Sequence, residues 1–390
     1  MPEGRMKKIL IIAGEASGDL HGSNLAREVK KLDPSVQFYG VGSKRMREAG
    51  VRILAEASEI SVVGLTEVLL HLRKILGVMR HLKNFLREER PDFLILIDFP
   101  DFNIQIGKAA KKLGIPIRYY ISPQVWAWRK GRIKQIAELV KAVVVVFPFE
   151  VGLYQSADVD VRYVGHPLVD VVHSGYSPVE ARRELGLDPG RRTIALLPGS
   201  RKKEITHLLP DMLGAAKLLQ EKFPDLQFVL PVAPTLDRDF IGAYSVRCGV
   251  PVRIVDGRVY DALRASNAAI VASGTATLET GLMAVPMVIV YRVSRLSYMI
   301  GRMLVDAEDV GLVNIVAGKR IVPEFIQDKV TPQNIADAAS RMLSDPAYSD
   351  QIRDGLEGVR TRLGRAGASA RAAAVVMEVL RSTGENHGNL

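Results

Sequence analysis

Cysteine and aromatic residues are scarce in this chain, and the shortage of cysteine excludes whole classes of protein. The only cysteine among 390 residues is Cys248, so an internal disulfide is impossible, and no zinc-ligand spacing surrounds it. A reducing compartment is therefore expected. Aromatic residues make up 6% of the chain, and its two tryptophans, Trp126 and Trp128, stand together. This pairing draws attention to one short segment of the sequence.

Long apolar runs are also missing. The longest, residues 142–149 and 283–291, are far shorter than the roughly 20 residues that a membrane-spanning helix needs. The polar start, residues 1–5, leads directly into a strand-like segment, without the apolar core and cleavage site of a signal peptide. We expect neither a transmembrane span nor a secretion signal.

Positive charge is in excess, because 53 Lys and Arg residues against 43 Asp and Glu give a formal net charge of +10. Such an excess suits nucleic acid, anionic lipid or phosphorylated substrates. The sequence contains no zinc-finger spacing, no aromatic ribonucleoprotein motif and no long basic tract. We therefore expect phosphorylated substrates or an anionic lipid surface as partners, and no nucleic acid.

Apolar runs alternate with helical stretches along the chain, which predicts α/β architecture with parallel sheets. The first series of expected strands is 9–13, 37–41, 93–97, 117–121, 142–147 and 162–164; the second is 193–197, 227–230, 253–255, 268–272 and 287–290. A polar loop is expected between them, at 173–192. The pattern predicts two Rossmann-like domains, 1–170 and 171–350, facing a central cleft where the ligand binds. Residues 351–390 are expected to form C-terminal helices and a tail, with the first domain as one possible packing partner.

Asp98 follows the apolar run 93–97, at the edge where open parallel sheets bind their ligands. A carboxylate there can take the proton of an attacking hydroxyl. The alternative is that it caps a helix opening near Asn103, although Asp101 lies closer to that start. The tryptophans after the next predicted strand are either core anchors or part of the cleft wall.

Residues 14–19, G-E-A-S-G-D, follow the first predicted strand, where glycines allow a tight turn close to a ligand. The segment is neither a dinucleotide fingerprint nor a Walker motif. A plain strand-to-helix turn is the alternative.

Two similar loops occur in the second half, L-P-G-S-R at 197–201 and S-G-T-A-T at 273–277. Backbone amides at a helix start, together with the guanidinium of Arg201, can hold a diphosphate. Glu279, one turn into the second helix, either accepts hydrogen bonds from ribose or stabilises the helix start. A simple turn with a solvated arginine is the alternative for the first loop.

These segments, with I-D-F-P-D-F-N at 97–103, S-P-Q-V-W-A-W-R at 122–129 and G-H-P at 165–167, occur in an order and spacing that resembles the lipid-A-disaccharide synthases. The resemblance covers nearly the whole chain. It implies a GT-B fold and an inverting glycosyltransferase that uses no metal and no cofactor.

The resemblance also implies the site residues. Asp98 is the implied general base and Arg201 the catalytic cation. The implied nucleotide-binding residues are Gly199, Ser200, Arg201, Ser273, Gly274, Thr275, Ala276, Thr277 and Glu279. The implied sugar contacts are Glu15, Ser17, Asp19, His21, Gln124, Asn314 and Gln327.

An apolar stripe with helical spacing precedes the Asp98 strand, and cations surround it. Such stripes usually pack on a core, but this one also suits a helix on anionic lipid. The resemblance favours membrane and acyl-chain contact by Val62, Val63, Leu65, Val68, Leu69, Leu72, Ile75 and Leu76.

By resemblance, the donor is UDP-2,3-diacylglucosamine and the acceptor is 2,3-diacylglucosamine 1-phosphate (lipid X). The products are the disaccharide phosphate of lipid A and UDP, formed in the cytoplasm at the periphery of the inner membrane. Two alternatives stay open: a UDP-sugar 2-epimerase, and a non-catalytic UDP-sugar-binding peripheral membrane protein.

Overall fold

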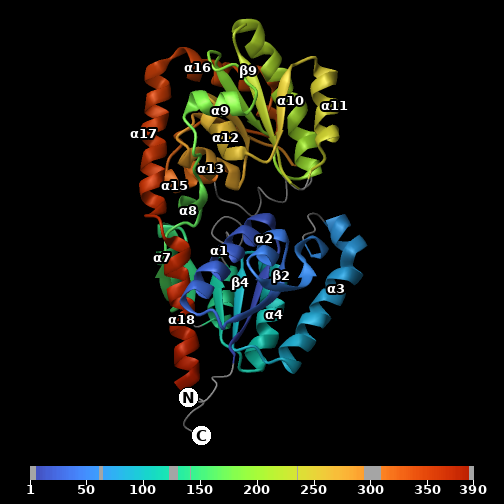
Figure 1. Ribbon diagram of the computed structural model, residues 1–390, viewed down its shortest axis with the longest axis vertical. Helices are drawn as coiled ribbons and strands as arrows, with labels where there is room; N and C mark the ends of the chain where they lie inside the picture. The colour runs from blue at the N-terminus through green and yellow to red at the C-terminus, as the bar shows by residue number, and fades with distance from the viewer. Residues whose placement is uncertain are drawn as a thin grey trace. The chain divides into compact units, whose positions relative to one another are not determined.

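The computed structural model describes residues 6–60, 65–122, 131–140, 142–234, 236–293 and 309–385, with the side chains of α3 described from residue 72. The chain divides into two compact units (Figure 1). Unit 1 comprises Met1–Asp170 and Gly364–Leu390, and unit 2 comprises Val171–Leu363. The C-terminal segment from residue 351 is therefore divided between the units: the helix that ends at Leu363 belongs to unit 2, and the helix that begins at Ala368 belongs to unit 1.

The described part of unit 1 holds a parallel sheet of seven strands in the order β3-β2-β1-β4-β5-β6-β7. Its central strands are continuous apolar runs because helices cover both faces. The strands are β1 (Lys8–Ala13), β2 (Gln37–Gly42), β3 (Val51–Glu56), β4 (Phe93–Ile97), β5 (Ile117–Tyr120), β6 (Ala142–Val145) and β7 (Asp160–Tyr163). The helices are α1 (Ala16–Leu32), α2 (Lys44–Glu48), η1 (Ala57–Glu59), α3 (Leu65–Glu88), α4 (Pro100–Lys112), α6 (Gly131–Leu139), α7 (Pro148–Gln155), α8 (Leu168–Val171) and α18 (Ala368–Glu385).

Unit 2 repeats the design with a parallel sheet whose described strands run β10-β9-β8-β11-β12-β13. The strands are β8 (Thr193–Leu197), β9 (Gln227–Val232), β10 (Val252–Asp256), β11 (Ala268–Ala272), β12 (Met287–Tyr291) and β13 (Glu324–Ile326). The helices are α9 (Pro178–Glu184), α10 (Lys202–Lys222), α11 (Arg238–Cys248), α12 (Val259–Ala265), α13 (Thr275–Leu282), α15 (Leu312–Ala317), η2 (Gln327–Lys329), α16 (Pro332–Ser344) and α17 (Pro346–Leu363). The expected class of two Rossmann-like units is confirmed.

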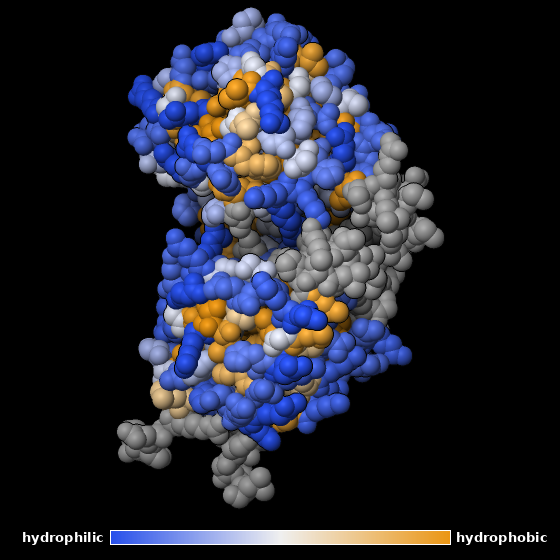
Figure 2. Space-filling model, turned by 90° about the vertical axis from the view of Figure 1, so that its right-hand side faces the viewer, coloured by the Kyte–Doolittle hydropathy of each residue, from blue (hydrophilic) through white to orange (hydrophobic). Residues whose placement is uncertain are grey.

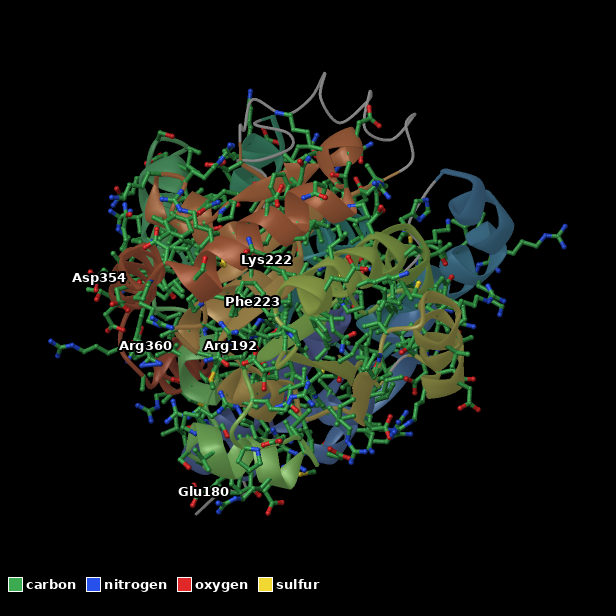
Figure 3. The ribbon with its side chains drawn as sticks, turned by 90° about the horizontal axis from the view of Figure 1, so that it is seen from above. Glu180, Arg192, Lys222, Phe223, Asp354 and Arg360 are labelled. Atoms are coloured by element: carbon green, nitrogen blue, oxygen red, sulfur yellow. The ribbon has the colours of Figure 1, made fainter. Side chains whose placement is uncertain are left out.

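The structure corrects three details of the expected elements. The edge strand β3 was not expected because Arg52 and Glu56 leave it without a continuous apolar run of the length of the other strands. The three-residue strand β13 is too short to leave a periodic signal. The expected loop 173–192 contains α9, whose start is a capping box between Ser177 and Glu180 with Pro178 in the first turn (Glu180 is labelled in Figure 3).

At the C-terminal end of α10 in unit 2, two cationic side chains lie over the ring of the C-cap residue Phe223. The guanidinium of Arg192 lies 4.7 Å from the ring centre of Phe223, and the ammonium of Lys222 lies 5.7 Å from it (Figure 3). Arg192 also pairs with the exposed carboxylate of Asp225. Cations over an aromatic face stabilise such a corner by modest electrostatic attraction.

The last helix, α18, packs against α1 within unit 1 (Figure 1). Asp170 caps it, since its Oδ1 accepts from the amide of Gly367 at 2.6 Å and its Oδ2 from the amide of Ser369 at 3.1 Å. Arg371 also donates to the carbonyl of Val164 at 2.9 Å. The C-terminal helix is therefore held to unit 1 by two charged side chains.

Candidate active site

In unit 1, the loops after β1 and β4 leave the sheet at its topological switch point. These two strands are neighbours in the sheet, and their chains continue to opposite sides of it. Open α/β sheets bind ligands at this position. Glu15 follows β1 and Asp98 follows β4, so the sheet places both carboxylate-bearing residues at the expected edge.

The backbone at Asp98 is strained and firmly held. Asp98 and Phe99 have φ angles of 43° and 46°, a left-handed conformation that costs about 1 to 3 kcal/mol per residue outside glycine. The Asp98 amide donates to the carbonyl of Ile121 at 3.0 Å, and its carbonyl accepts from Tyr119 at 2.6 Å and Asn103 at 2.8 Å. Three hydrogen bonds therefore fix the residue that carries the carboxylate. The support from Tyr119 and Asn103 was not predicted.

The helix after Asp98 begins earlier than expected. Its first residue is Pro100, and its N-cap is Phe99, so neither Asp98 nor Asp101 is the N-cap residue. The ring of Phe99 lies directly on Gly14 of the neighbouring loop, where an added Cβ would come within 2.5 Å of the ring. The glycine is therefore needed for the close approach of the two loops.

The polar residues after β1 differ in burial, since Glu15 and Ser17 are partly exposed and Asp19 is buried. Glu15 is the N-cap of α1, and Ser17 is half-buried in the first turn. Asp19 is buried, and its carboxylate accepts from the amides of Ser43 at 2.6 Å, Arg45 at 3.1 Å and Met46 at 3.3 Å. Asp19 thus caps α2, and its expected sugar contact stays a prediction.

His21 belongs to a buried cluster of rings. It meets His166 edge to face at a centroid distance of 5.9 Å, and His166 lies 5.0 Å from Phe147. Burial, with a smaller effect from Arg45, lowers the pKa of His21 to about 4. Burial also holds the pKa of His166 well below its ordinary value, and its Nδ1 accepts from the amide of Leu168. Both imidazoles are therefore neutral near pH 7.

Several predicted residues fall outside the described parts of the chain. They are Val62, Val63, Gln124, Trp126 and Trp128, together with the side chains of Leu65, Val68 and Leu69.

In unit 2, the two expected loops leave adjacent strands at a second switch point. Residues 198–201 follow β8, residues 273–274 follow β11, and these strands pair in parallel. The sheet therefore brings together the two loops that the sequence assigned to a diphosphate.

The donors of the first loop are engaged by a carboxylate that the sequence analysis missed. Glu204 Oε2 accepts from the amides of Ser200 at 2.9 Å and Arg201 at 3.2 Å, and Oε1 accepts from the Arg201 guanidinium at 3.3 Å. Gly199, with φ of 112°, allows the turn. A glutamate three residues after the N-cap is a capping-box signal that could have revealed it.

The second loop presents helix amides directly. The N-cap of α13 is Gly274, and it offers no capping side chain to the amides of Thr275 and Ala276. The neighbouring hydroxyls serve the backbone: Ser273 donates to the carbonyl of Val310 at 2.7 Å, and Thr277 to that of Gly274 at 2.8 Å. The helix start therefore suits an anion.

Glu279 lies one turn further along α13 and is half-buried. Its Oε1 accepts a hydrogen bond from the phenol of Tyr260 at 3.0 Å. Tyr260 belongs to α12 and was not predicted, because nothing in the local sequence connects it with a residue 19 positions later.

Asn314 is fully buried and its amide is used within the chain. It donates to the carbonyl of Val322 and to Glu324, and its oxygen accepts from the amides of Ile321 and Val322. Burial raises the pKa of Glu324 despite these hydrogen bonds. Asn314 therefore shapes the turn before β13, and its expected sugar contact stays a prediction.

Gln327, with φ of 53°, likewise binds backbone. Its side chain accepts from the amide of Val293 at 2.8 Å and donates to the carbonyl of Val293 at 3.0 Å. It thereby fixes the chain just beyond β12.

Among the described residues, no group of three or more His, Cys, Asp or Glu side chains is arranged to hold a metal ion.

Comparison with known proteins agrees with the motifs. The family model for lipid-A-disaccharide synthetase matches residues 9–378. A lipid-A-disaccharide synthase of Geobacter metallireducens is 49% identical over 374 residues, covering 96% of this chain and 97% of that protein. One of Syntrophus aciditrophicus is 49% identical over 378 residues, covering 97% and 99%.

The fold recurs in solved structures with little sequence identity. A UDP-GlcNAc 2-epimerase from Neisseria meningitidis, bound to UDP-GlcNAc, superposes with a TM-score of 0.64 and 12% identity, covering 95% of this chain and 100% of that one. Identity this low shows a shared fold only. The match over nearly the whole length, with relatives close to half identical, shows that the chain belongs to the lipid-A-disaccharide synthetase family.

Proposed function

We propose that this chain is the hexosyltransferase that condenses UDP-2,3-diacylglucosamine with 2,3-diacylglucosamine 1-phosphate. The products are lipid A disaccharide 1-phosphate and UDP, and the anomeric configuration is inverted. The observation that carries the proposal is the family match over residues 9–378, within which the predicted base and the predicted diphosphate loops occupy the switch points of their sheets.

Asp98 is the general base of this proposal. Its carboxylate takes the proton from the primary hydroxyl of the acceptor as that oxygen attacks the anomeric carbon of the donor. The carbon–oxygen bond to UDP breaks, and the diphosphate leaves with the bonding electrons. The firmly held backbone at Asp98 supports this role, since a base must be positioned before the proton moves. Glu15 and Ser17, on the neighbouring loop, are assigned to the acceptor.

Unit 2 stabilises the leaving group. The amides of Thr275 and Ala276 at the start of α13 bind the diphosphate, and the Arg201 guanidinium neutralises the charge that develops on it. The amides of Ser200 and Arg201 can bind the diphosphate only after their hydrogen bonds to Glu204 break. Glu279 accepts hydrogen bonds from the ribose. Asn314 and Gln327 hold the turns beside the site, and their sugar contacts stay predictions.

Acceptor dependence distinguishes this reaction from its alternatives. Purified protein is incubated with donor alone and then with donor plus lipid X, and released UDP is measured. We expect release only with the acceptor, loss of most turnover in Asp98→Asn, and no effect of EDTA. Conversion of the donor without acceptor identifies an epimerase, and absence of UDP release identifies a binding protein. The relatives named as synthases favour the first outcome, because the epimerase likeness is confined to the fold.

The membrane contact is assigned to α3. Its buried residues, among them Val78 and Leu82, join the core of unit 1, and Ile75 packs against the same core. Leu72 and Leu76, one turn apart, instead expose 41% and 49% of their surface. The predicted stripe therefore divides into a core side and an outward side.

Cations accompany the outward side, since Arg73, Lys74 and Arg80 are exposed on α3. Figure 2 turns toward the viewer the side of the molecule on which Figure 1 shows α3, and both apolar and polar residues lie on the unit 1 part of that side. Apolar side chains flanked by cations suit an anionic lipid surface. Among the helices that the structure describes, none combines the length and apolar composition needed to cross a bilayer. We assign the protein to the cytoplasmic face of the inner membrane by this peripheral contact.

Vesicle sedimentation tests the assignment. The double variant Leu72→Ser with Leu76→Ser should bind vesicles of mixed zwitterionic and anionic phospholipid several-fold more weakly than the unaltered protein. The matched control is Leu32→Ser, because Leu32 is 55% exposed at the end of α1, away from α3 in the sequence. Equal binding by both variants would refute the role of α3.

A further inference from the structure

We propose that Tyr260 is a positioning residue that fixes the Glu279 carboxylate for the ribose diol, so that the pair selects ribonucleotide over deoxyribonucleotide donors. The observation is the hydrogen bond from the Tyr260 phenol to Glu279 Oε1 at 3.0 Å, which joins α12 to α13. The proposal rests on the ribose role assigned to Glu279 above and extends it to a residue on a second helix.

The position of Glu279 relates the pair to the diphosphate donors. Helical side chains lean toward the helix start, so the fifth residue of α13 carries its carboxylate back over the first turn. The amides of Thr275 and Ala276 belong to that turn, and the N-cap Gly274 has no side chain to cap them. A nucleoside diphosphate bound there by its phosphates would extend its ribose toward the carboxylate. Glu279 and Tyr260 are both only half-buried, so solvent and ligand reach them.

The helix that carries Tyr260 is braced from two directions. Arg258, the N-cap of α12 with φ of 51°, donates to Asp261 at 2.9 Å and to the carbonyl of Glu184 at 3.0 Å. Asp261 in turn accepts from Ser174 at 2.8 Å. In Figure 1 the short helix α12 lies between α9 and α13. The backbone that carries Tyr260 is therefore held in place where the phenol donates to Glu279.

The chemistry of the pair explains the selection. An ionised carboxylate accepts on several lone pairs of its two oxygens. The phenol occupies one of them on Oε1 and thereby sets the plane of the group. A carboxylate oriented in this way can present both of its oxygens to two adjacent hydroxyls at once, an arrangement that favours a vicinal diol. A deoxyribose offers one hydroxyl fewer and leaves one acceptor without its donor.

Calorimetric titration of the full chain with UDP and with 2′-deoxy-UDP tests the proposal. We expect the unaltered protein to bind UDP about tenfold more tightly than the deoxy compound, as a lost hydrogen bond to a charged group predicts. In Tyr260→Phe this ratio should fall to about threefold or less, because the carboxylate keeps its charge but loses its orientation. The donor KM should rise while kcat changes little. The matched control is Tyr348→Phe, because the Tyr348 ring lies under the Arg341 guanidinium at 3.8 Å and phenylalanine keeps that contact.

Two comparisons separate the possible failures. Titration with inorganic pyrophosphate shows whether each variant keeps a folded diphosphate site, and unchanged pyrophosphate affinity is expected for Tyr260→Phe and Glu279→Ala. If Glu279→Ala loses the ribose preference and Tyr260→Phe keeps it, the positioning role is overturned and the ribose role of Glu279 stands. If both variants keep the full preference, the ribose role of Glu279 is overturned together with it. Loss of pyrophosphate binding in Tyr260→Phe would also overturn the proposal, because the tyrosine would then support the fold of the site.

Discussion

Acidification should destabilise unit 1 through its buried histidine His21. The ring lies against His166 and is only 4% exposed, and Nδ1 of His21 has no hydrogen-bond partner among the described residues. Burial first, and the charge of Arg45 second, lower its pKa from 6.5 to about 4. The folded state therefore keeps His21 neutral over a range of pH in which the unfolded chain protonates it.

The sign and size of the effect follow from these two pKa values. Above pH 6.5 both states are neutral at His21, and its contribution to stability is complete. As pH falls from 6.5 to about 4, the unfolded state takes up the proton first, so stability is lost across this window. Between pH 7.5 and pH 4.5 the loss amounts to about 2.5 kcal/mol in the free energy of unfolding. His166, whose pKa burial also lowers, adds a loss of the same sign.

Urea unfolding followed by tryptophan fluorescence measures this loss. Both tryptophans belong to residues 1–170, so their emission reports on unit 1. In His21→Phe the difference in stability between pH 7.5 and pH 4.5 should shrink by about 2.5 kcal/mol. His81→Phe, which removes an exposed histidine of the same unit, should leave it unchanged. An equal pH dependence in His21→Phe and the unaltered protein would show that His21 does not titrate in this way.

Three further outcomes follow from the described contacts. Gly14→Ala would push the Phe99 ring aside and should lower stability by about 1 to 3 kcal/mol and turnover at least tenfold, as urea curves and UDP release will show; normal turnover would contradict the tight packing. Asp170→Ala removes the cap of the last helix, and hydrogen exchange of that helix should speed up as its local stability falls by about 1 kcal/mol, whereas unchanged exchange would contradict the cap's role. Glu204→Gln keeps an acceptor for the loop amides but removes a negative charge, so calorimetry should find UDP bound several-fold more tightly; weaker binding would mean that the charge is needed to hold Arg201.

The sequence predicted the fold well because fully buried strands carry their own signal. Strands such as β4 and β11 are apolar at every position, and the sheet buries them completely. An edge strand such as β3 lacks that signal because only Val51 and Ala55 of its six residues are buried and the exposed Arg52 interrupts its apolar residues. The start of α9 had a local signal in Ser177 and Glu180, and the loop composition obscured it. Errors therefore fell on edges and short elements.

The site was predicted to the level of loops rather than of contacts. The carboxyl ends of β4, β8 and β11 identify where Asp98, Arg201 and Glu279 lie, because parallel topology places the ends of neighbouring strands at the same edge of each sheet. The partners of these residues come from distant parts of the chain: Tyr119 supports Asp98, and Tyr260 reaches Glu279. No local pattern encodes such pairs, so only the folded structure reveals them.

The hydrogen bonds also separate two kinds of motif residue that the sequence could not distinguish. Asp19 and Asn314 are buried, and their side chains form hydrogen bonds with backbone amides and carbonyls. They therefore stabilise the conformation of the neighbouring loops. Asp98 and Glu279 are half-buried at strand and helix ends and receive support from other residues. Truncating the first pair removes acceptors for buried donors and should lower stability and activity together. Truncating the second pair should lower activity with little change in stability, which makes the ratio of the two losses a direct measure of which motif residues touch substrate.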